Sequence, residues 1–215
     1  MSIAYLLRQS PFLELEFREK LFKMETILRM TAVDWIIFWL AIGAHVPLIL
    51  GTLKQKEDGS QTLTTWGLYF LLDIITMFSS NKIDGSYVIL LGFSVGSFVM
   101  SSILLYQGRI GWTWLETIMI ILVGLCIGAW LTSGPYMAVI FGIMSEVIVG
   151  INLIIKTWKN PVVKYNLVGY VVFLIVSLLT FATAEDLSIK QAGYAICETI
   201  LSIIILIPLV KNWLK

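Results

Sequence analysis

The sequence predicts an all-α integral membrane protein with seven transmembrane helices, built as two parallel three-helix repeats joined by a linker helix. Composition is the first reason, because 58% of the 215 residues are apolar and only 13% are charged, against about 25% charged residues in soluble domains. The second is that the apolar residues form seven stretches between residues 33 and 211. The third is that stretches one to three weakly resemble stretches five to seven. Lipid is therefore the expected solvent, the length favours one domain, and the net charge of +1 gives no indication of a nucleic-acid partner.

Residues 1–30 are more polar than the rest and form a separate N-terminal segment. The segment has no uninterrupted apolar core, so it does not match a signal peptide. Ser10 and Pro11 suit the N-cap and the first position of a helix, and apolar residues recur at helical spacing from Leu13 to Leu28. We expect an amphipathic helix over 11–30 that lies along the membrane surface, with a cap packed against the bundle as the alternative.

Each apolar stretch has the length of a membrane-crossing helix, which needs about 20 mostly apolar residues. The predicted spans are 33–53, 63–80, 86–106, 113–132, 136–156, 166–184 and 191–210. Segments with turn-forming residues separate them, such as KQKEDGSQ, SSNKIDGS, SGP and KNP. The first repeat then covers 33–106, the linker helix 113–132 and the second repeat 136–211. Glu116 falls near the start of the linker helix, close to the interface, where a carboxylate can stay solvated.

The basic residues of the loops are distributed unequally between the two sides of the predicted membrane. Eight fall on one side and two, Lys82 and Lys190, on the other. The eight are Lys54, Lys56, Arg109, Lys156, Lys159, Lys164, Lys211 and Lys215. The positive-inside rule places that side in the cytoplasm. We therefore expect a multi-pass protein of the cell (inner) membrane with its N-terminus outside and its C-terminus in the cytoplasm.

The two predicted repeats share a short sequence pattern at the ends of spans one and five, VPLILGTLKQ and INLIIKTWKN. Four positions match in register: Leu48/Leu153, Ile49/Ile154, Thr52/Thr157 and Lys54/Lys159. A stretch with a glycine followed by aromatic residues comes after each, and spans three and seven both open near a glycine and a tyrosine. Because three spans reverse the direction of the chain across the membrane and one extra span restores it, a three-one-three order makes the repeats parallel.

Pro47 near the end of span one is followed by a basic stretch and by a polar entry to span two that contains Thr62, Thr64 and Trp66. This pattern resembles the PQ-loop and SWEET transporter superfamily. The resemblance implies seven spans in a three-one-three order, an external N-terminus, and transport by alternating access with Pro47 as a hinge. The Pro-Gln dipeptide of that family is replaced by Pro47-Leu48 in the first half and by Asn152-Leu153 in the second.

Three carboxyl groups lie deep in the predicted spans, where ionisable groups are costly and mark candidate functional sites. Asp73, Glu146 and Glu198 belong to spans two, five and seven, and the helical rise puts them within about 5 Å of one another in depth. No Lys or Arg occupies the middle of any span. Either the acids are protonated at rest or a cation binds to them, which indicates proton coupling or a cationic, polar solute. The alternative for each is a neutral acid hydrogen-bonded to a neighbouring Ser or Thr.

Other polar side chains of the spans are candidates for the same site. Trp66 and Tyr69 belong to a polar stripe at helical spacing in span two, and Ser94 and Ser97 share one face of span three. Tyr194 lies near the start of span seven. We include these five residues with the acids as predicted substrate-binding or proton-binding positions.

Asn152 and His45 complete the candidate set. Asn152 stands where the family has a proline, so its amide can bind a solute or bridge helices. His45, the only histidine, suits a proton relay because imidazole titrates near neutral pH, and a hydrogen-bonded core residue is the alternative. A metal site is disfavoured, since there is no second histidine and Cys126 and Cys197 lack ligand spacing.

Small residues and tryptophans in the spans have structural explanations that need no ligand. Two patterns, Gly92-x-x-x-Gly96 and Gly124-x-x-x-Gly128, suit close helix packing. The tryptophans near span ends suit anchors at the membrane interface. They are Trp112, Trp114, Trp158 and Trp213.

These observations favour a membrane transporter of a small polar or cationic solute that works by alternating access, with proton coupling as an option. The alternative is a membrane receptor or scaffold that binds cargo with a SWEET-like fold and does not transport it. An intramembrane enzyme is disfavoured because no Gly-x-Ser-x-Gly elbow or Ser–His pairing is evident. A retinal photoreceptor is disfavoured because it needs a lysine deep in the last span, whereas Lys190 and Lys211 lie at the ends of span seven. No cofactor is expected. The expected partners are membrane lipid, a small-molecule substrate and protons, and homo-oligomer formation is left open.

Overall fold

The computed structural model describes residues 30–54, 62–83, 86–112, 114–159 and 163–214. The chain consists of a first unit, Met1–Ile36, and a second unit, Ile37–Lys215. Only residues 30–36 of the first unit are described. The amphipathic helix expected over 11–30 therefore lies outside the described residues, except for Met30.

Seven helices within the described ranges are long and apolar enough to cross a membrane. They are α3 (Ala32–Lys54), α4 (Leu63–Lys82), α5 (Val88–Tyr106), α6 (Trp114–Ser133), α7 (Pro135–Lys159), α8 (Val163–Ala182) and α9 (Tyr194–Trp213), the last preceded by a π-helical turn (Ile189–Gly193). These helices confirm the prediction of an all-helical protein with seven spans. α7 continues past the predicted end at 156 to Lys159, because the first helix-breaking residue, Pro161, comes two positions later.

Local sequence explains where α3 and α7 begin. Thr31 and Asp34 cap α3 reciprocally, since Asp34 Oδ2 accepts from the Thr31 N–H at 2.9 Å and Thr31 Oγ1 accepts from the Asp34 N–H at 3.2 Å. Between α6 and α7 the chain turns at Gly134, whose φ of +88° favours glycine. Pro135 then opens α7, a position where its missing N–H costs nothing.

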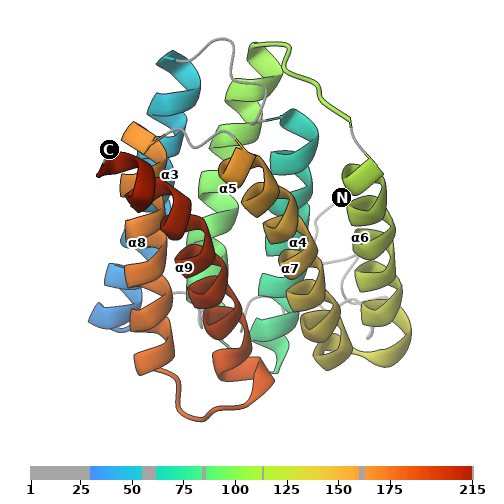
Figure 1. The fold of residues 1–215 in the computed structure, drawn as a ribbon. Helices are drawn as coiled ribbons and strands as arrows, with labels where there is room; N and C mark the ends of the chain where they lie inside the picture. Colours follow the sequence, from blue (N-terminus) through green and yellow to red (C-terminus); the bar gives the residue numbers. More distant parts are fainter. Residues whose placement is uncertain (1–29, 55–61, 84–85, 113, 160–162, 215) are drawn as a thin grey trace, which may run out of the picture. The chain divides into compact units, whose positions relative to one another are not determined.

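The helices of the second unit alternate in direction, so that α3, α5, α7 and α9 all end on the side drawn at the top of Figure 1. α5 contacts both α3 and α4, and α9 contacts both α7 and α8. α4 also packs against α7, and residues of α3 and α5 pack against α8. α6 packs against α4 and α7. Six helices therefore surround a common interior, with α6 outside it.

The two predicted small-residue patterns differ in the structure. Side chains of α3 lie so close to Gly92-x-x-x-Gly96 of α5 that a Cβ added to its glycines would overlap Ala41 and the His45 ring, respectively. This pattern serves close helix packing, as predicted. Beside Gly124-x-x-x-Gly128 of α6, no neighbouring atom lies within 4 Å of either added Cβ, so close packing on this pattern is absent from the described part of the chain.

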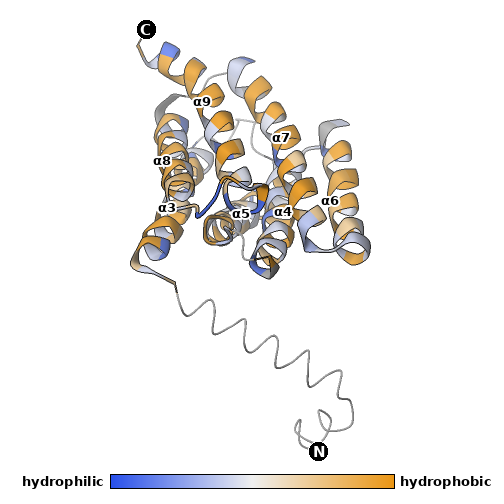
Figure 2. Cartoon of the chain, turned by 90° about the horizontal axis from the view of Figure 1, so that it is seen from below, coloured by the Kyte–Doolittle hydropathy of each residue, from blue (hydrophilic) through white to orange (hydrophobic). Residues whose placement is uncertain are grey.

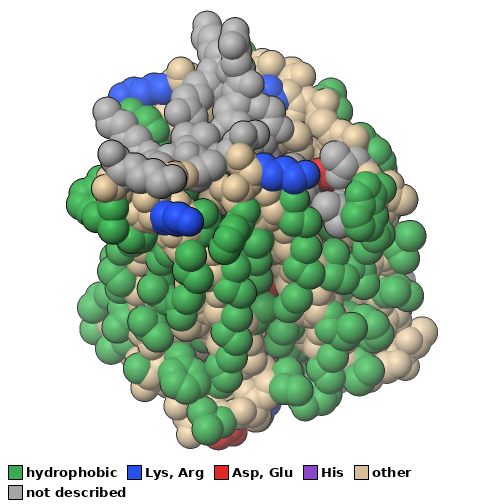
Figure 3. All heavy atoms as spheres, viewed as in Figure 1, with side chains coloured by type: hydrophobic (Ala, Val, Ile, Leu, Met, Phe, Trp, Pro, Cys, Tyr) green, Lys and Arg blue, Asp and Glu red, His purple; other side chains and the backbone are tan. Residues whose placement is uncertain are grey.

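The second unit has an apolar surface, the reverse of a soluble protein. Hydrophobic residues dominate its helices in Figure 2 and the face shown in Figure 3. Large side chains such as Trp39, Ile121 and Leu131 are exposed, the last of them by 76%. Basic side chains gather near one end of the face in Figure 3. This distribution matches a multi-pass membrane protein with lipid around its helices.

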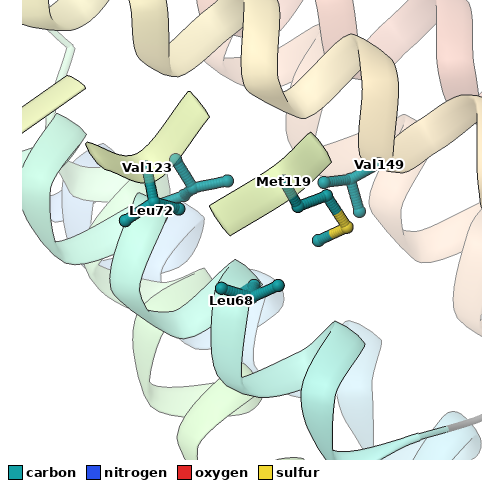
Figure 4. Close-up of a cluster of buried hydrophobic side chains, with 5 residues drawn as sticks. All are labelled: Leu68, Leu72, Met119, Val123 and Val149. Atoms are coloured by element: carbon teal, nitrogen blue, oxygen red, sulfur yellow. The ribbon is translucent and has the colours of Figure 1, made fainter. Parts of the chain in front are cut away.

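A cluster of buried hydrophobic side chains attaches α6 to its neighbours (Figure 4). It consists of Leu68 and Leu72 of α4, Met119 and Val123 of α6, and Val149 of α7. Dispersion contacts between the closely packed side chains hold such a cluster together. α6 is therefore fixed to both α4 and α7.

Glu116 corrects one expectation from the sequence. Its side chain is fully buried in the first turn of α6, so the expectation of a solvated carboxylate is wrong. The Thr65 hydroxyl of α4 donates a hydrogen bond to Glu116 Oε1 at 2.8 Å. This partner makes burial of the carboxyl group tolerable. A sequence pattern gives no sign of such a partner, because Thr65 lies 51 residues away.

Candidate functional site

A cavity of about 50 Å³ lies between α3, α4, α5, α7, α8 and α9. One water needs about 10–15 Å³ of such space, so the cavity has room for a few waters or for a solute of similar size. Its lining residues are His45, Trp66, Tyr69, Asp73, Phe93, Ser97, Glu146, Gly150, Leu153, Tyr170, Phe173, Tyr194, Glu198, Leu201, Ser202 and Ile205. Every described span except α6 contributes to this list.

Asp73, Glu146 and Glu198 all line this cavity, from α4, α7 and α9. They are buried, with exposed fractions of 2%, 3% and 9%. Lys and Arg are absent from the lining residues. The structure thus brings the three predicted acids together in a space without a basic side chain that could balance their charge.

Asp73 is held by hydroxyl groups from two other helices. Ser97 Oγ of α5 donates to Asp73 Oδ2, and the Tyr194 hydroxyl of α9 donates to Asp73 Oδ1, each at 3.2 Å. Both carboxyl oxygens therefore act as acceptors. In this arrangement the carboxyl group is held between α5 and α9.

Glu146 and Glu198 are arranged differently, because their carboxyl groups neighbour each other in the cavity. Two charged carboxylates repel, whereas a carboxyl group and a carboxylate can share one proton in a short, charge-assisted hydrogen bond. The pair titrates as a unit for the same reason. It can therefore hold one shared proton or bind a cation in its place.

Tyr170 of α8 is a site residue that sequence reasoning missed. Its side chain is 5% exposed, and its hydroxyl has no hydrogen-bond partner among the described residues. A buried polar group without a partner costs about 1–3 kcal/mol. A signal was present in the sequence, since Tyr170, Phe173, Ser177 and Thr180 are spaced by three or four residues and form the buried face of α8.

His45 lies among aromatic rings at the cavity wall. Its Nδ1 donates to the Ala41 carbonyl oxygen at 3.0 Å, because that oxygen can only accept. The imidazole centroid lies 4.9 Å from that of Phe173, 5.7 Å from Trp66 and 5.8 Å from Phe93, all in edge-to-face geometry. These contacts favour the hydrogen-bonded core residue over the proton relay.

Of the remaining predicted residues, some line the cavity and others do not. Trp66 and Tyr69 line the cavity, with ring centroids 5.6 Å apart. Ser94 does not line it, since its hydroxyl donates to a carbonyl oxygen one turn earlier in α5 at 2.8 Å. Pro47 lies inside α3 and is not a lining residue. Asn152 belongs to α7, but its side chain lies outside what the structure describes.

Comparisons with known protein families, with characterised proteins and with solved structures find no match to this chain. Evidence about function therefore comes from the cavity itself. In the described ranges, no cluster of three or more His, Cys, Asp or Glu side chains has the arrangement of a metal site. The cavity offers carboxyl groups, hydroxyl groups and aromatic rings, which suit the binding of cations and protons.

Proposed function

We propose that the protein is a membrane transporter that exchanges a small cationic solute for a proton at the carboxyl groups of the cavity. The observation that carries the proposal is the meeting of Asp73, Glu146 and Glu198 in one cavity without a basic side chain. Ionisable groups inside membranes are rare, and they mark ion and proton pathways. Three acids without a basic side chain favour a cation over an anion.

The exchange begins with the proton shared by Glu146 and Glu198. An entering cation with one positive charge replaces that proton, which leaves to the aqueous side, and the net charge of the cavity does not change. Asp73 keeps its hydroxyl donors beside the pair. The other titratable groups that line the cavity are His45, Tyr69, Tyr170 and Tyr194. Because cation and proton compete for the same carboxyl groups, a gradient of one drives movement of the other.

Two parallel three-helix repeats that rock against each other form the second part of the proposal. In support, α5 contacts α3 and α4 as α9 contacts α7 and α8, so the third helix of each repeat contacts the first two. α6 lines no part of the cavity, as suits a linker. The PQ-loop and SWEET superfamily, which the sequence resembles, has this three-one-three order. Movement of the repeats about Pro47 would open the cavity to each side in turn.

The proposed orientation puts the ends of α3, α5, α7 and α9 in the cytoplasm of a cell with this protein in its inner membrane. Support comes from Lys54, Arg109, Lys159 and Lys211, which lie in the last turn of these helices or just after it. Reporter fusions at both termini test it. A cytoplasmic C-terminus and an external N-terminus are expected, and the opposite result contradicts the orientation.

Transport is tested in proteoliposomes that hold a pH indicator, to which a panel of small inorganic and organic cations is added outside. An accepted cation should enter as protons leave, and the interior should become more alkaline. Liposomes with the Glu146→Gln/Glu198→Gln double variant, and liposomes without protein, report passive entry of neutral amines. If folded wild-type protein moves no proton with any cation of the panel, the transport proposal is wrong. Cation binding without flux would instead indicate the receptor or scaffold.

A further inference from the structure

We propose that the solute is a primary ammonium compound, whose –NH₃⁺ group is bound by oxygen atoms of Glu146, Glu198 and Tyr170. This inference rests on the proposed function, since it concerns the same cavity. It adds the chemical class of the solute and a residue that selects it.

The Tyr170 hydroxyl is the observation that indicates a ligand. It lines the cavity, its side chain is 5% exposed, and it has no hydrogen-bond partner among the described residues. Buried hydroxyl groups almost always have a partner. By contrast, the Tyr194 hydroxyl in the same cavity already donates to Asp73. A solute that offers Tyr170 a hydrogen bond is therefore favoured in this cavity.

A primary ammonium group can donate to Glu146, Glu198 and Tyr170 at the same time. It has three N–H donors, and Glu146, Glu198 and Tyr170 all line the cavity and carry oxygen atoms that can accept them. The Tyr170 hydroxyl can accept from the ammonium group while the two carboxyl groups accept its other N–H donors. A quaternary ammonium has no N–H group and would leave the hydroxyl without a partner.

Aromatic rings at the cavity wall suit the carbon chain of such a solute. Phe173 lies beside Tyr170, with ring centroids 5.8 Å apart, and Phe93 lies 4.9 Å from Phe173. Aromatic faces attract cations and accept apolar carbon chains. The cavity volume of about 50 Å³ limits the carbon chain to a short one in this conformation. Methylammonium and its N-methylated relatives are therefore suitable probes.

A series of probes tests the inference on the wild-type protein alone. Purified full-length protein in lipid nanodiscs is titrated with methylammonium, dimethylammonium, trimethylammonium and tetramethylammonium. Affinity should fall stepwise as N–H donors are lost, by on the order of tenfold or more across the series. Equal affinity for all four overturns the primary ammonium class and leaves cation exchange standing. Absence of binding of any cation overturns the proposed function as well.

Tyr170→Phe tests the selecting residue, because it removes the hydroxyl and keeps the ring. Methylammonium affinity should fall by on the order of tenfold, while tetramethylammonium affinity stays the same. Tyr136→Phe, at an exposed position outside the cavity, is the matched control and should change neither. An equal loss for both probes, or no loss for either, contradicts the role of Tyr170. Thermal unfolding shows whether each variant is folded. If Tyr170→Phe does not fold, the probe series on the wild-type protein alone tests the primary ammonium class.

Discussion

At the scale of single residues, Gly96 illustrates how a missing side chain shapes the cavity wall. The His45 ring occupies the space where a Cβ on Gly96 would lie. The ring cannot move away freely, because it packs against Phe173, Trp66 and Phe93 and donates to the Ala41 carbonyl oxygen. The wall therefore depends on this glycine as much as on the histidine.

We predict that Gly96→Ala destabilises the protein, because the methyl group forces the imidazole out of its aromatic contacts. Overpacking of this kind lowers the free energy of unfolding by about 1–3 kcal/mol. Thermal unfolding of the detergent-solubilised protein measures the effect. Gly67→Ala in α4 is the control, since no neighbouring atom lies within 4 Å of its added Cβ. Equal unfolding temperatures for Gly96→Ala and wild type would show that the ring is not confined.

Single residues also show what the sequence could predict of the site. Asp73, Glu146 and Glu198 were predictable because a charge in an apolar span is conspicuous and helical rise fixes its depth. Tyr170 was not predicted, since a tyrosine in a span has many structural explanations. The spacing of polar and aromatic residues in α8 gave a weak signal, and its unpaired hydroxyl in the structure distinguishes Tyr170 from the other residues of that face. Ser94 was predicted for the site, but its hydroxyl bonds within its own helix, a choice that depends on side-chain rotation rather than on sequence spacing.

At the scale of helices, the attachment of α6 to α4 depends on a buried polar contact as well as on the hydrophobic cluster. We predict that Thr65→Val destabilises the protein, because Glu116 loses the hydroxyl that donates to it at 2.8 Å. A hydrogen bond of this kind contributes about 0.5–1.5 kcal/mol, and about 1.5–3 kcal/mol where one of its groups is charged. Thr132→Val, at an exposed position of α6 whose hydroxyl bonds within its helix, should be close to neutral. Thermal unfolding that is the same for both variants would contradict the importance of this contact.

Pro47 tests whether α3 contains a hinge. A proline inside a helix removes one backbone hydrogen bond and permits bending there. Under the proposed mechanism, Pro47→Ala should slow exchange in proteoliposomes several-fold and leave cation affinity unchanged, because the residue does not line the cavity. Val46→Ala, the exposed neighbour, is the control. Unchanged exchange by Pro47→Ala would remove Pro47 from the mechanism.

Helix positions were the most predictable part of the fold. Hydropathy located all seven spans, because lipid selects for length and apolar character alone. It did not predict the π-helical turn at Ile189–Gly193, which depends on backbone geometry rather than on composition. It also did not predict which helices touch, because an apolar helix surface suits lipid and protein neighbours equally well.

At the scale of the whole protein, the central claim is that one proton leaves the cavity when one cation binds. In the proposed exchange, carboxyl groups of α7 and α9 share the proton, and a third acid from α4 stays bonded to its hydroxyl donors. Because the proton and the cation compete, cation affinity should rise with pH, by about tenfold per pH unit where one proton is released.

Proton release can be measured directly by calorimetry. Methylammonium, or the tightest-binding cation of the panel, is titrated into the nanodisc-embedded protein at one pH in two buffers that differ in ionisation enthalpy. The difference in heat gives the number of protons released for each cation bound. We predict about one proton for the wild type and none for the Glu146→Gln/Glu198→Gln double variant, if that variant still binds the cation at Asp73. Cation binding to the wild type without proton release would contradict the exchange.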